Sequence, residues 1–251
     1  MPDKIIRNIR LTIEYDGTNY CGWQVQSRAS KKSIQGVIEK ALQRIFRTKV
    51  KLIGSGRTDA GVHALGQVAN FHSKSKIPLS NIQKALNSYL PDDIVIQKAQ
   101  AVTSAFHSRF SAKAKTYRYT ILNRSYPSAI LRHAEYFYPY FLDADLMRKE
   151  SRVLLGRHDF RSFQACDKKE RDSFRTIKRI DINRSGDLIR IELEADGFLY
   201  NMVRNIVGTL IEIGRNKLPP GSLKKILLAK NRKLAGPTAP AKGLMLVRVR
   251  Y

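Results

Sequence analysis

Apolar residues recur at two different spacings in the first part of the chain. Between residues 9 and 15 every second residue is apolar, which is the period of a half-buried β-strand, and the pattern stops at the Asp16-Gly17 turn. After Ser33 the apolar residues recur every three or four positions up to Phe46, as on one face of an α-helix with a serine cap. The pattern therefore predicts a strand, a turn and a helix in this region.

The same two spacings alternate along the rest of the chain. Strands are predicted at 50–53, 66–72, 94–99, 113–121 and 244–251, with a hairpin that turns through 184–187. Further helices are predicted at 80–90, 143–156, 199–213 and 222–230, where Pro91 and Gly214 end two of them and Asp143 caps a third. Because strands and helices alternate throughout, we expect an α/β or α+β fold.

Two short sequence echoes suggest that the chain contains two related halves. EYDGTNY at 14–20 is similar to EADGFLY at 194–200, and GRTD at 56–59 is similar to GRHD at 156–159. The order of the two motifs is reversed between the halves. An internal duplication is therefore a hypothesis at this point.

The net charge of the chain adds a functional prediction to the α/β or α+β fold, namely a polyanionic partner. The 251 residues include 46 Lys plus Arg against 21 Asp plus Glu, a formal net charge of +25. Such an excess predicts an extended polyanion as partner, whereas the 43% of hydrophobic residues is enough for a packed core. The basic runs at 168–179 and 217–233 favour a surface that follows phosphates.

Cysteine usage and hydropathy restrict the class of protein further. Cys21 and Cys166 are not part of a CxxC pair, so we expect no structural zinc site and two free thiols that suit a reducing compartment. The N-terminal sequence MPDKIIRNIR has no apolar region of the signal-peptide kind, and no stretch approaches the roughly 18 apolar residues of a membrane span. We therefore expect a soluble, cytoplasmic protein without a membrane partner.

The stretch GSGRTDAGVHALGQ, residues 54–67, places Asp59 between Arg57 and a run of glycines. Glycines of this kind are typical of phosphate-binding loops, but a Walker loop needs Gly-Lys-Ser/Thr after them, and a dinucleotide fingerprint needs Gly or Ala at position 59. The next predicted helix also begins too late to offer its N-terminus to a phosphate. The stretch therefore disfavours a nucleotide cofactor.

Two interpretations of Asp59 remain open from the local sequence. It is a turn residue, because Asp stabilises turns and tolerates awkward backbone angles. Alternatively it is a lone catalytic carboxylate, kept ionised by Arg57 or by another arginine within ~4–6 Å in the fold. Since the loop contains no second acid, paired-carboxylate and two-metal chemistry have no local support.

Aromatic and basic residues in the second half offer further candidates. Tyr117 and Tyr119 share one face of the predicted strand 113–121, either as core aromatics or as a platform on which RNA bases stack. Arg204 interrupts the apolar helix 199–213 and needs a carboxylate partner if it does not reach water. The histidines lack metal-like spacing, so we assign them to structure or phosphate contact and expect no metal site.

A series of blocks that runs in order from about residue 14 to residue 247 resembles the TruA family of tRNA pseudouridine synthases. The blocks are EYDGTNYCGWQ, SIQG, GRTDAGVHALGQV, LPDDIVI, FHSRFSAKAKTYRY, GRHDFRSF, FLYNMVRNIVGTL and GPTAPAKGLML. The resemblance implies an isomerase that converts uridine to pseudouridine at tRNA positions 38, 39 and 40, in the anticodon stem-loop.

The family pattern also implies roles for individual residues. Asp59 corresponds to the catalytic nucleophile, Tyr117 to the tyrosine that lies against the target uracil, and Arg204 to the arginine that pairs with the catalytic aspartate. Arg57 corresponds to the arginine that helps to displace and hold the flipped nucleotide. The family forms homodimers whose tRNA reaches across both subunits, and it uses neither a cofactor nor a metal.

The resemblance also refines the expected architecture. We expect two pseudo-symmetric halves, each a mainly antiparallel sheet with helices packed on it, and an active-site cleft between the halves. The division is placed at residue 105: residues 1–105 carry the catalytic Asp loop, and residues 106–251 carry the active-site Tyr strand and the Arg helix.

Two other functional classes compete with this hypothesis. A non-catalytic RNA-binding or ribosome-assembly protein is favoured by composition alone, and in such a protein Asp59 is a dispensable turn residue. A methyltransferase would carry a Gly-rich loop directly after its first strand, where this chain has EYDGTNY, and a metal nuclease would carry clustered acids or histidines. The sequence leaves open whether Asp59 attacks C6 of the base, attacks the sugar carbon or removes a ribose proton.

Overall fold

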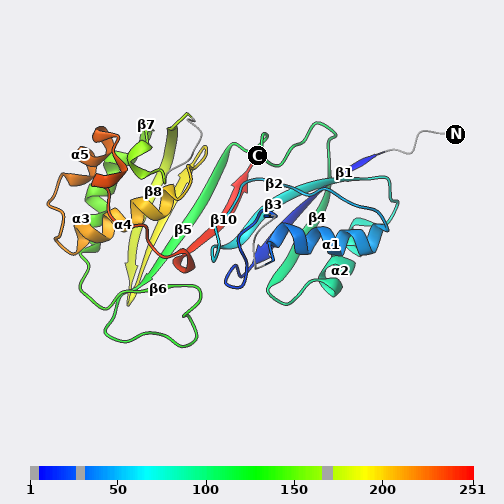
Figure 1. The fold of residues 1–251 in the computed structure, drawn as a ribbon, viewed down its shortest axis with the longest axis horizontal. Helices are drawn as coiled ribbons and strands as arrows, with labels where there is room; N and C mark the ends of the chain where they lie inside the picture. Colours follow the sequence, from blue (N-terminus) through cyan, green and yellow to red (C-terminus); the bar gives the residue numbers. More distant parts are fainter. Residues whose placement is uncertain (1–5, 27–31, 166–171) are drawn as a thin grey trace. The chain divides into compact units, whose positions relative to one another are not determined.

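The computed structural model describes residues 6–26, 32–165 and 172–251, which divide into two compact units (Figure 1). Unit 1 comprises Met1–Lys113 together with Leu246–Tyr251, and unit 2 comprises Ala114–Met245. The last six residues therefore belong to the same unit as the N-terminal part of the chain.

In unit 1 the sheet strands follow the order β4-β1-β3-β10. Strand β1 pairs antiparallel with β3 and β4, and the short strand β2 pairs antiparallel with β3. Its strands are β1 (Arg7–Tyr15), β2 (Ile53–Gly54), β3 (His63–Ser73), β4 (Ile94–Val102) and β10 (Leu244–Arg250), of which the first two residues belong to unit 2. The alternation that predicted β1 is confirmed, since Ile9, Leu11 and Ile13 are fully buried.

Two amphipathic helices complete the core of unit 1. Helix α1 (Ile34–Phe46) packs against α2 (Leu79–Tyr89), which in turn packs beside β4. The Ser33 cap is confirmed, because its side-chain oxygen accepts a hydrogen bond from Gly36 N at 3.2 Å. The buried side chains Ile34, Ile38 and Leu42 follow the helical spacing seen in the sequence.

In unit 2 the sheet strands follow the order β5-β9-β8-β7. Its strands are β5 (Ala114–Leu122), β6 (Tyr136–Phe137), β7 (Gly156–Asp159), β8 (Phe174–Ser185) and β9 (Leu188–Ala195). The predicted hairpin is the β8–β9 pair, whose turn contains Gly186 at a φ of 56°. Strand β6 pairs with β5 in parallel, and the other pairings are antiparallel.

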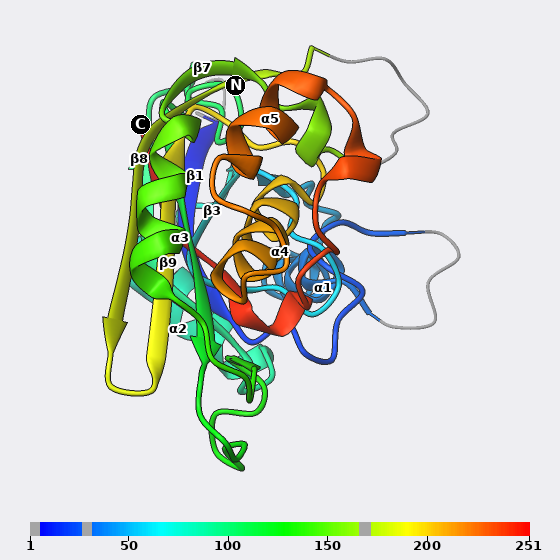
Figure 2. The ribbon, with the colours of Figure 1, turned by 90° about the vertical axis from the view of Figure 1, so that its left-hand side faces the viewer.

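Three helices and several short 3₁₀ turns pack on this sheet. Helix α3 (Ala144–Ser151) contacts α4 (Met202–Gly214) and β8, and α5 (Ser222–Ala229) contacts both α3 and α4 (Figure 2). Along α4 nearly every side chain is buried. At Gly208 a Cβ atom would lie 1.7 Å from Pro237 O, so only glycine lets the segment after α5 approach α4 this closely. The 3₁₀ turns are 152–154, 161–163, 232–234 and 241–243.

The structure confirms the mixed α/β class and the mainly antiparallel pairing, and it corrects some of the predicted bounds. The predicted strand 50–53 is mostly wrong, because Leu52 N donates to Glu39 Oε1 and Leu52 O accepts from Gln35 Nε2, both at 3.0 Å, so side chains of α1 replace a strand partner. The helix predicted to begin at residue 199 begins at Met202, since Asn201 has a left-handed φ of 58°.

The remaining predictions are confirmed in part or are not tested by the structure. The helix predicted at 143–156 is eight residues long and is followed by the 3₁₀ turn 152–154; the Asp143 cap is confirmed by a 2.8 Å bond to Leu146 N. Cys166 and the start of the basic run 168–179 lie outside the described residues. The division at residue 105 and the pseudo-symmetry of the halves stay predictions.

Within the described ranges, no helix has the length and hydrophobicity needed to cross a membrane. The same residues contain no group of three or more His, Cys, Asp or Glu side chains arranged to hold a metal ion.

Candidate functional site

Asp59 lies on the loop between β2 and β3, as predicted. Within this loop the exposed side chain of Arg57 precedes the buried side chain of Thr58, and Asp59 is half-buried. Thr58 thus anchors the loop in unit 1 between two charged neighbours that remain accessible.

The backbone around Asp59 is fixed by close contact with another loop of unit 1. Trp23 N donates a hydrogen bond to Thr58 O at 3.0 Å, and Val62 N closes a turn on Asp59 O at 3.1 Å. A Cβ atom at Gly22 would lie 2.5 Å from Thr58 O, and Gly22 also has a φ of 104°. This contact therefore requires glycine at position 22.

Buried side chains hold the same loop from beneath. The Tyr15 hydroxyl and Thr58 Oγ1 are 2.8 Å apart, and burial raises the pKa of Tyr15, so its hydroxyl stays protonated. Gln67 Nε2 donates to Gly56 O at 3.0 Å, and Gln67 Oε1 accepts from Ser55 Oγ at 2.6 Å. Strands β1 and β3 thereby connect to the loop through satisfied polar groups rather than apolar contact alone.

The Asp and Gly of the EYDG motif form a turn that packs against the Asp59 loop. His63 Nδ1 lies 3.1 Å from Gly17 N and 3.0 Å from Asp16 Oδ1, so the imidazole ties the Asp16-Gly17 turn to the start of β3. A Cβ atom at Gly17 would lie 2.1 Å from Val62 O. The assignment of His63 to a structural role agrees with these contacts.

In unit 2, Tyr117 lies on β5 with 7% of its surface exposed. Its ring meets Phe198 edge-on, with 5.1 Å between the ring centroids. Tyr119 on the same face donates its hydroxyl to Pro240 O at 2.8 Å, which identifies it as a structural residue. On the opposite face Arg118 Nε donates to Glu192 Oε1 at 2.7 Å.

Arg204 lies in the first turn of α4 and is half-buried. Its Nε donates to Ala239 O at 2.7 Å and its Nη1 donates to Asn201 Oδ1 at 3.0 Å. Ala239 N in turn donates to Arg204 O at 3.1 Å. The guanidinium is therefore held at the N-terminal end of α4 and does not extend freely toward solvent.

The four residues named by the family pattern fall into two pairs. Arg57 and Asp59 belong to one loop of unit 1, whereas Tyr117 and Arg204 belong to β5 and α4 of unit 2. The supporting residues were not predicted. Tyr15 lies 43 residues from Thr58 in sequence, and Ala239 lies 35 residues from Arg204. Only the glycines at 17 and 22 carried a local signal, since each marks a turn.

Comparison with known proteins gives a consistent picture. A family model described as tRNA pseudouridine synthase matches residues 11–111 and 151–251. The chain is 49% identical over 246 residues to tRNA pseudouridine synthase A of Acetivibrio thermocellus, covering 98% of this chain and 100% of the relative. It is 46% identical to the proteins of that name from Thermoanaerobacter sp. and Bacillus licheniformis, covering 98% and 97% of this chain and 100% and 98% of the relatives.

The hydrogen bond between Tyr15 and Thr58 provides a direct test of how the Asp59 loop is held. We predict that Tyr15→Phe lowers the free energy of unfolding by ~1 kcal/mol and speeds amide hydrogen exchange at Val62. Tyr119→Phe is the matched control, because it removes a buried tyrosine bond of unit 2, to Pro240 O at 2.8 Å. Equal exchange at Val62 in both variants would show that Tyr15 does not hold the loop.

Proposed function

Because this chain belongs to the tRNA pseudouridine synthase family, we propose that it isomerises uridine to pseudouridine at positions 38, 39 and 40 of the tRNA anticodon stem-loop. The observation that carries the proposal is the placement of Asp59 on a loop that backbone contacts and buried polar groups hold in place. Such pre-organisation is what a reacting group requires.

The reaction needs a nucleophile and a base. The bond between N1 of uracil and C1′ of the ribose breaks, the base turns, C5 bonds to C1′, C5 loses a proton and N1 gains one. The substrate and product are isomers, so no electrons pass to another molecule. In our proposal the Asp59 carboxylate acts as the nucleophile, with C6 of the base or C1′ of the sugar as its target.

The other three residues act around this carboxylate in the proposal. Arg204, held by Asn201 and Ala239, pairs with Asp59 and keeps it ionised. The hydroxyl of Tyr117 removes the proton from C5, on a ring positioned by Phe198. The exposed side chain of Arg57 holds the flipped nucleotide, whose unstacking costs a few kcal/mol.

The proposed partner is the anticodon stem-loop of tRNA, and the proposed assembly is a homodimer in the cytoplasm. The net charge of +25 supports contact with RNA phosphates. Composition alone favours a non-catalytic RNA-binding or ribosome-assembly protein, but family membership over most of the chain disfavours that alternative.

The proposed positions can be tested by mapping the product. A tRNA transcript with uridine at 38, 39 and 40 is incubated with the protein, and pseudouridine is located by base-specific chemical labelling and primer extension. We predict labelling at these three positions, lost one at a time when each uridine is replaced by cytidine. Labelling at other positions alone would overturn the assignment of the positions, and no labelling anywhere would overturn the enzymatic proposal.

A catalytic role of Tyr117 can be distinguished from a structural role by comparing Tyr117→Phe with Tyr119→Phe. We predict that Tyr117→Phe binds tRNA normally but forms pseudouridine roughly 10²–10⁴-fold more slowly, because a general base is lost. Tyr119→Phe removes the buried bond to Pro240 O and should lower stability by ~1 kcal/mol with little effect on turnover. Unchanged turnover in Tyr117→Phe would remove this hydroxyl from the mechanism.

A further inference from the structure

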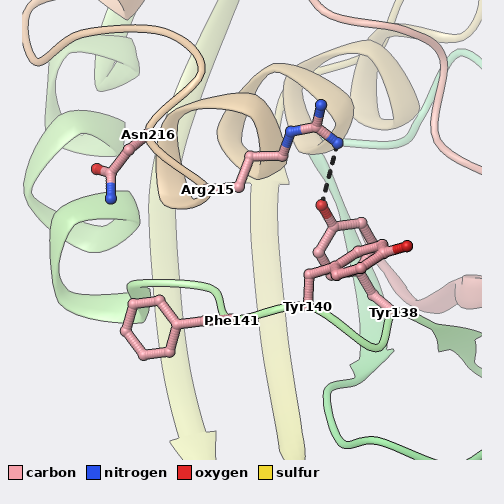
Figure 3. Close-up of a pocket in the computed structure, with 5 residues that line it drawn as sticks. All are labelled: Tyr138, Tyr140, Phe141, Arg215 and Asn216. Atoms are coloured by element: carbon pink, nitrogen blue, oxygen red, sulfur yellow. Dashed lines mark hydrogen bonds between the residues drawn. The ribbon is translucent and has the colours of Figure 1, made fainter.

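Unit 2 contains a cavity of about 570 Å³ that the proposed chemistry does not use (Figure 3). It is lined by Tyr138, Tyr140, Phe141, Arg215 and Asn216. The first three follow β6 and the last two follow α4. The volume lies within the range of pockets that bind small ligands.

Of the aromatic residues that line this pocket, two are exposed and one is buried and packs against further aromatic rings. Tyr140 and Phe141 are 69% and 74% exposed, whereas Tyr138 is buried. The rings of Tyr138 and Tyr140 meet edge-on with 5.7 Å between centroids, and Tyr136 lies behind Tyr138 at 6.1 Å. In Figure 3, Phe141 and Asn216 lie on one side of the pocket and the two tyrosines on the other. Tyr140 and Phe141 therefore offer exposed aromatic surface to a planar group that enters the pocket.

The upper edge of the pocket is cationic. Arg215 points its guanidinium toward the tyrosines and donates from Nη1 to the Tyr138 hydroxyl at 3.2 Å (Figure 3). This bond raises the pKa of Arg215, so the guanidinium stays charged. Glu212 lies near both Arg215 and Lys217, at 3.7 and 3.9 Å, and it offsets one of these two positive charges. Together these three side chains carry one net positive charge.

We propose that this pocket binds an unpaired nucleotide of the tRNA substrate, with the base between Tyr140 and Phe141 and its phosphate on Arg215. The inference rests on the proposed function, which makes tRNA the ligand. Asn216 supplies an amide that donates to and accepts from a base edge. The site is distinct from the reacting uridine, because Arg215 lies eleven residues beyond Arg204, about 16 Å along α4.

The lining favours RNA over a second copy of this chain. It consists of three aromatic side chains, an arginine and an asparagine, without an aliphatic residue. Stacking on aromatic rings beside arginine is the usual means of holding single-stranded nucleotides. A second copy carries the same net charge of +25, which opposes its approach to a cationic edge and attracts a polyanion.

The test measures the affinity of full-length tRNA for the variants Tyr140→Ala, Phe141→Leu and Arg215→Gln. We expect the two aromatic variants to raise Kd roughly tenfold or more with an unchanged salt slope, because a stacking contact is lost. Arg215→Gln should lower the salt slope by about one, because a phosphate contact is lost. Tyr140→Phe keeps the ring and should bind as the wild type does.

Tyr126→Ala is the matched control, because Tyr126 is also an exposed aromatic of unit 2, 61% exposed and stacked under Arg124, but does not line the pocket. An unchanged Kd in Tyr140→Ala and Phe141→Leu, or an equal loss in Tyr126→Ala, would overturn the proposal. A loss of affinity accompanied by conversion to a smaller species in sedimentation would identify a second copy as the occupant, and would overturn it too.

The rate of pseudouridine formation at saturating tRNA shows whether a failed test concerns the pocket or the proposed function. We expect the pocket variants to react at the wild-type rate once tRNA is saturating, because the reacting groups lie elsewhere. A lower rate at saturation would place the pocket in the reaction itself and contradict a separate site. A wild-type protein that binds tRNA without forming pseudouridine would instead refute the proposed function, while the Kd comparison would still decide whether the pocket binds RNA.

Discussion

The contact between two backbone segments of unit 1, residues 17–23 and 54–62, is the constraint on which the candidate site depends. At Gly17, Gly22 and Gly54 an added Cβ atom would lie 2.1, 2.5 and 2.4 Å from an atom of the facing segment. Glycine at these positions lets the segments touch, and the hydrogen bond from Trp23 N to Thr58 O then fixes the backbone before Asp59. The carboxylate is therefore presented by a loop whose conformation is set by β1 and β3.

In unit 2 the candidate residues are also held in place by neighbouring residues, and they lie on a strand and a helix rather than on a loop. Tyr117 is carried by β5 and backed by Phe198, and Arg204 is carried by α4 and anchored on Ala239 O. Sites supported by such elements hold their geometry better than sites on unsupported loops. In our proposal the excess of positive charge over the chain serves the RNA rather than the reaction.

Sequence patterns predicted most of the elements but few of the contacts that hold the site. Periodicity located β1 and the helix after Ser33 because each buries one regular face. Periodicity failed at 50–53, where the partners of Leu52 are the side chains of Gln35 and Glu39 in α1. The resemblance of the sequence motifs to a known family predicted roles for Asp59 and Arg204. It gave no sign of Tyr15 beneath Thr58, since a hydrogen bond between residues far apart in sequence leaves no local pattern.

We propose that the Asp59 carboxylate performs the chemistry on tRNA. The most direct measurement is tritium release from tRNA labelled at C5 of uridine, with the wild type and Asp59→Asn compared in parallel and their affinities for tRNA measured on the same preparations. We expect release by the wild type, and no release by Asp59→Asn despite unchanged affinity, because the amide is isosteric but not nucleophilic. Equal release by both proteins would contradict the proposal.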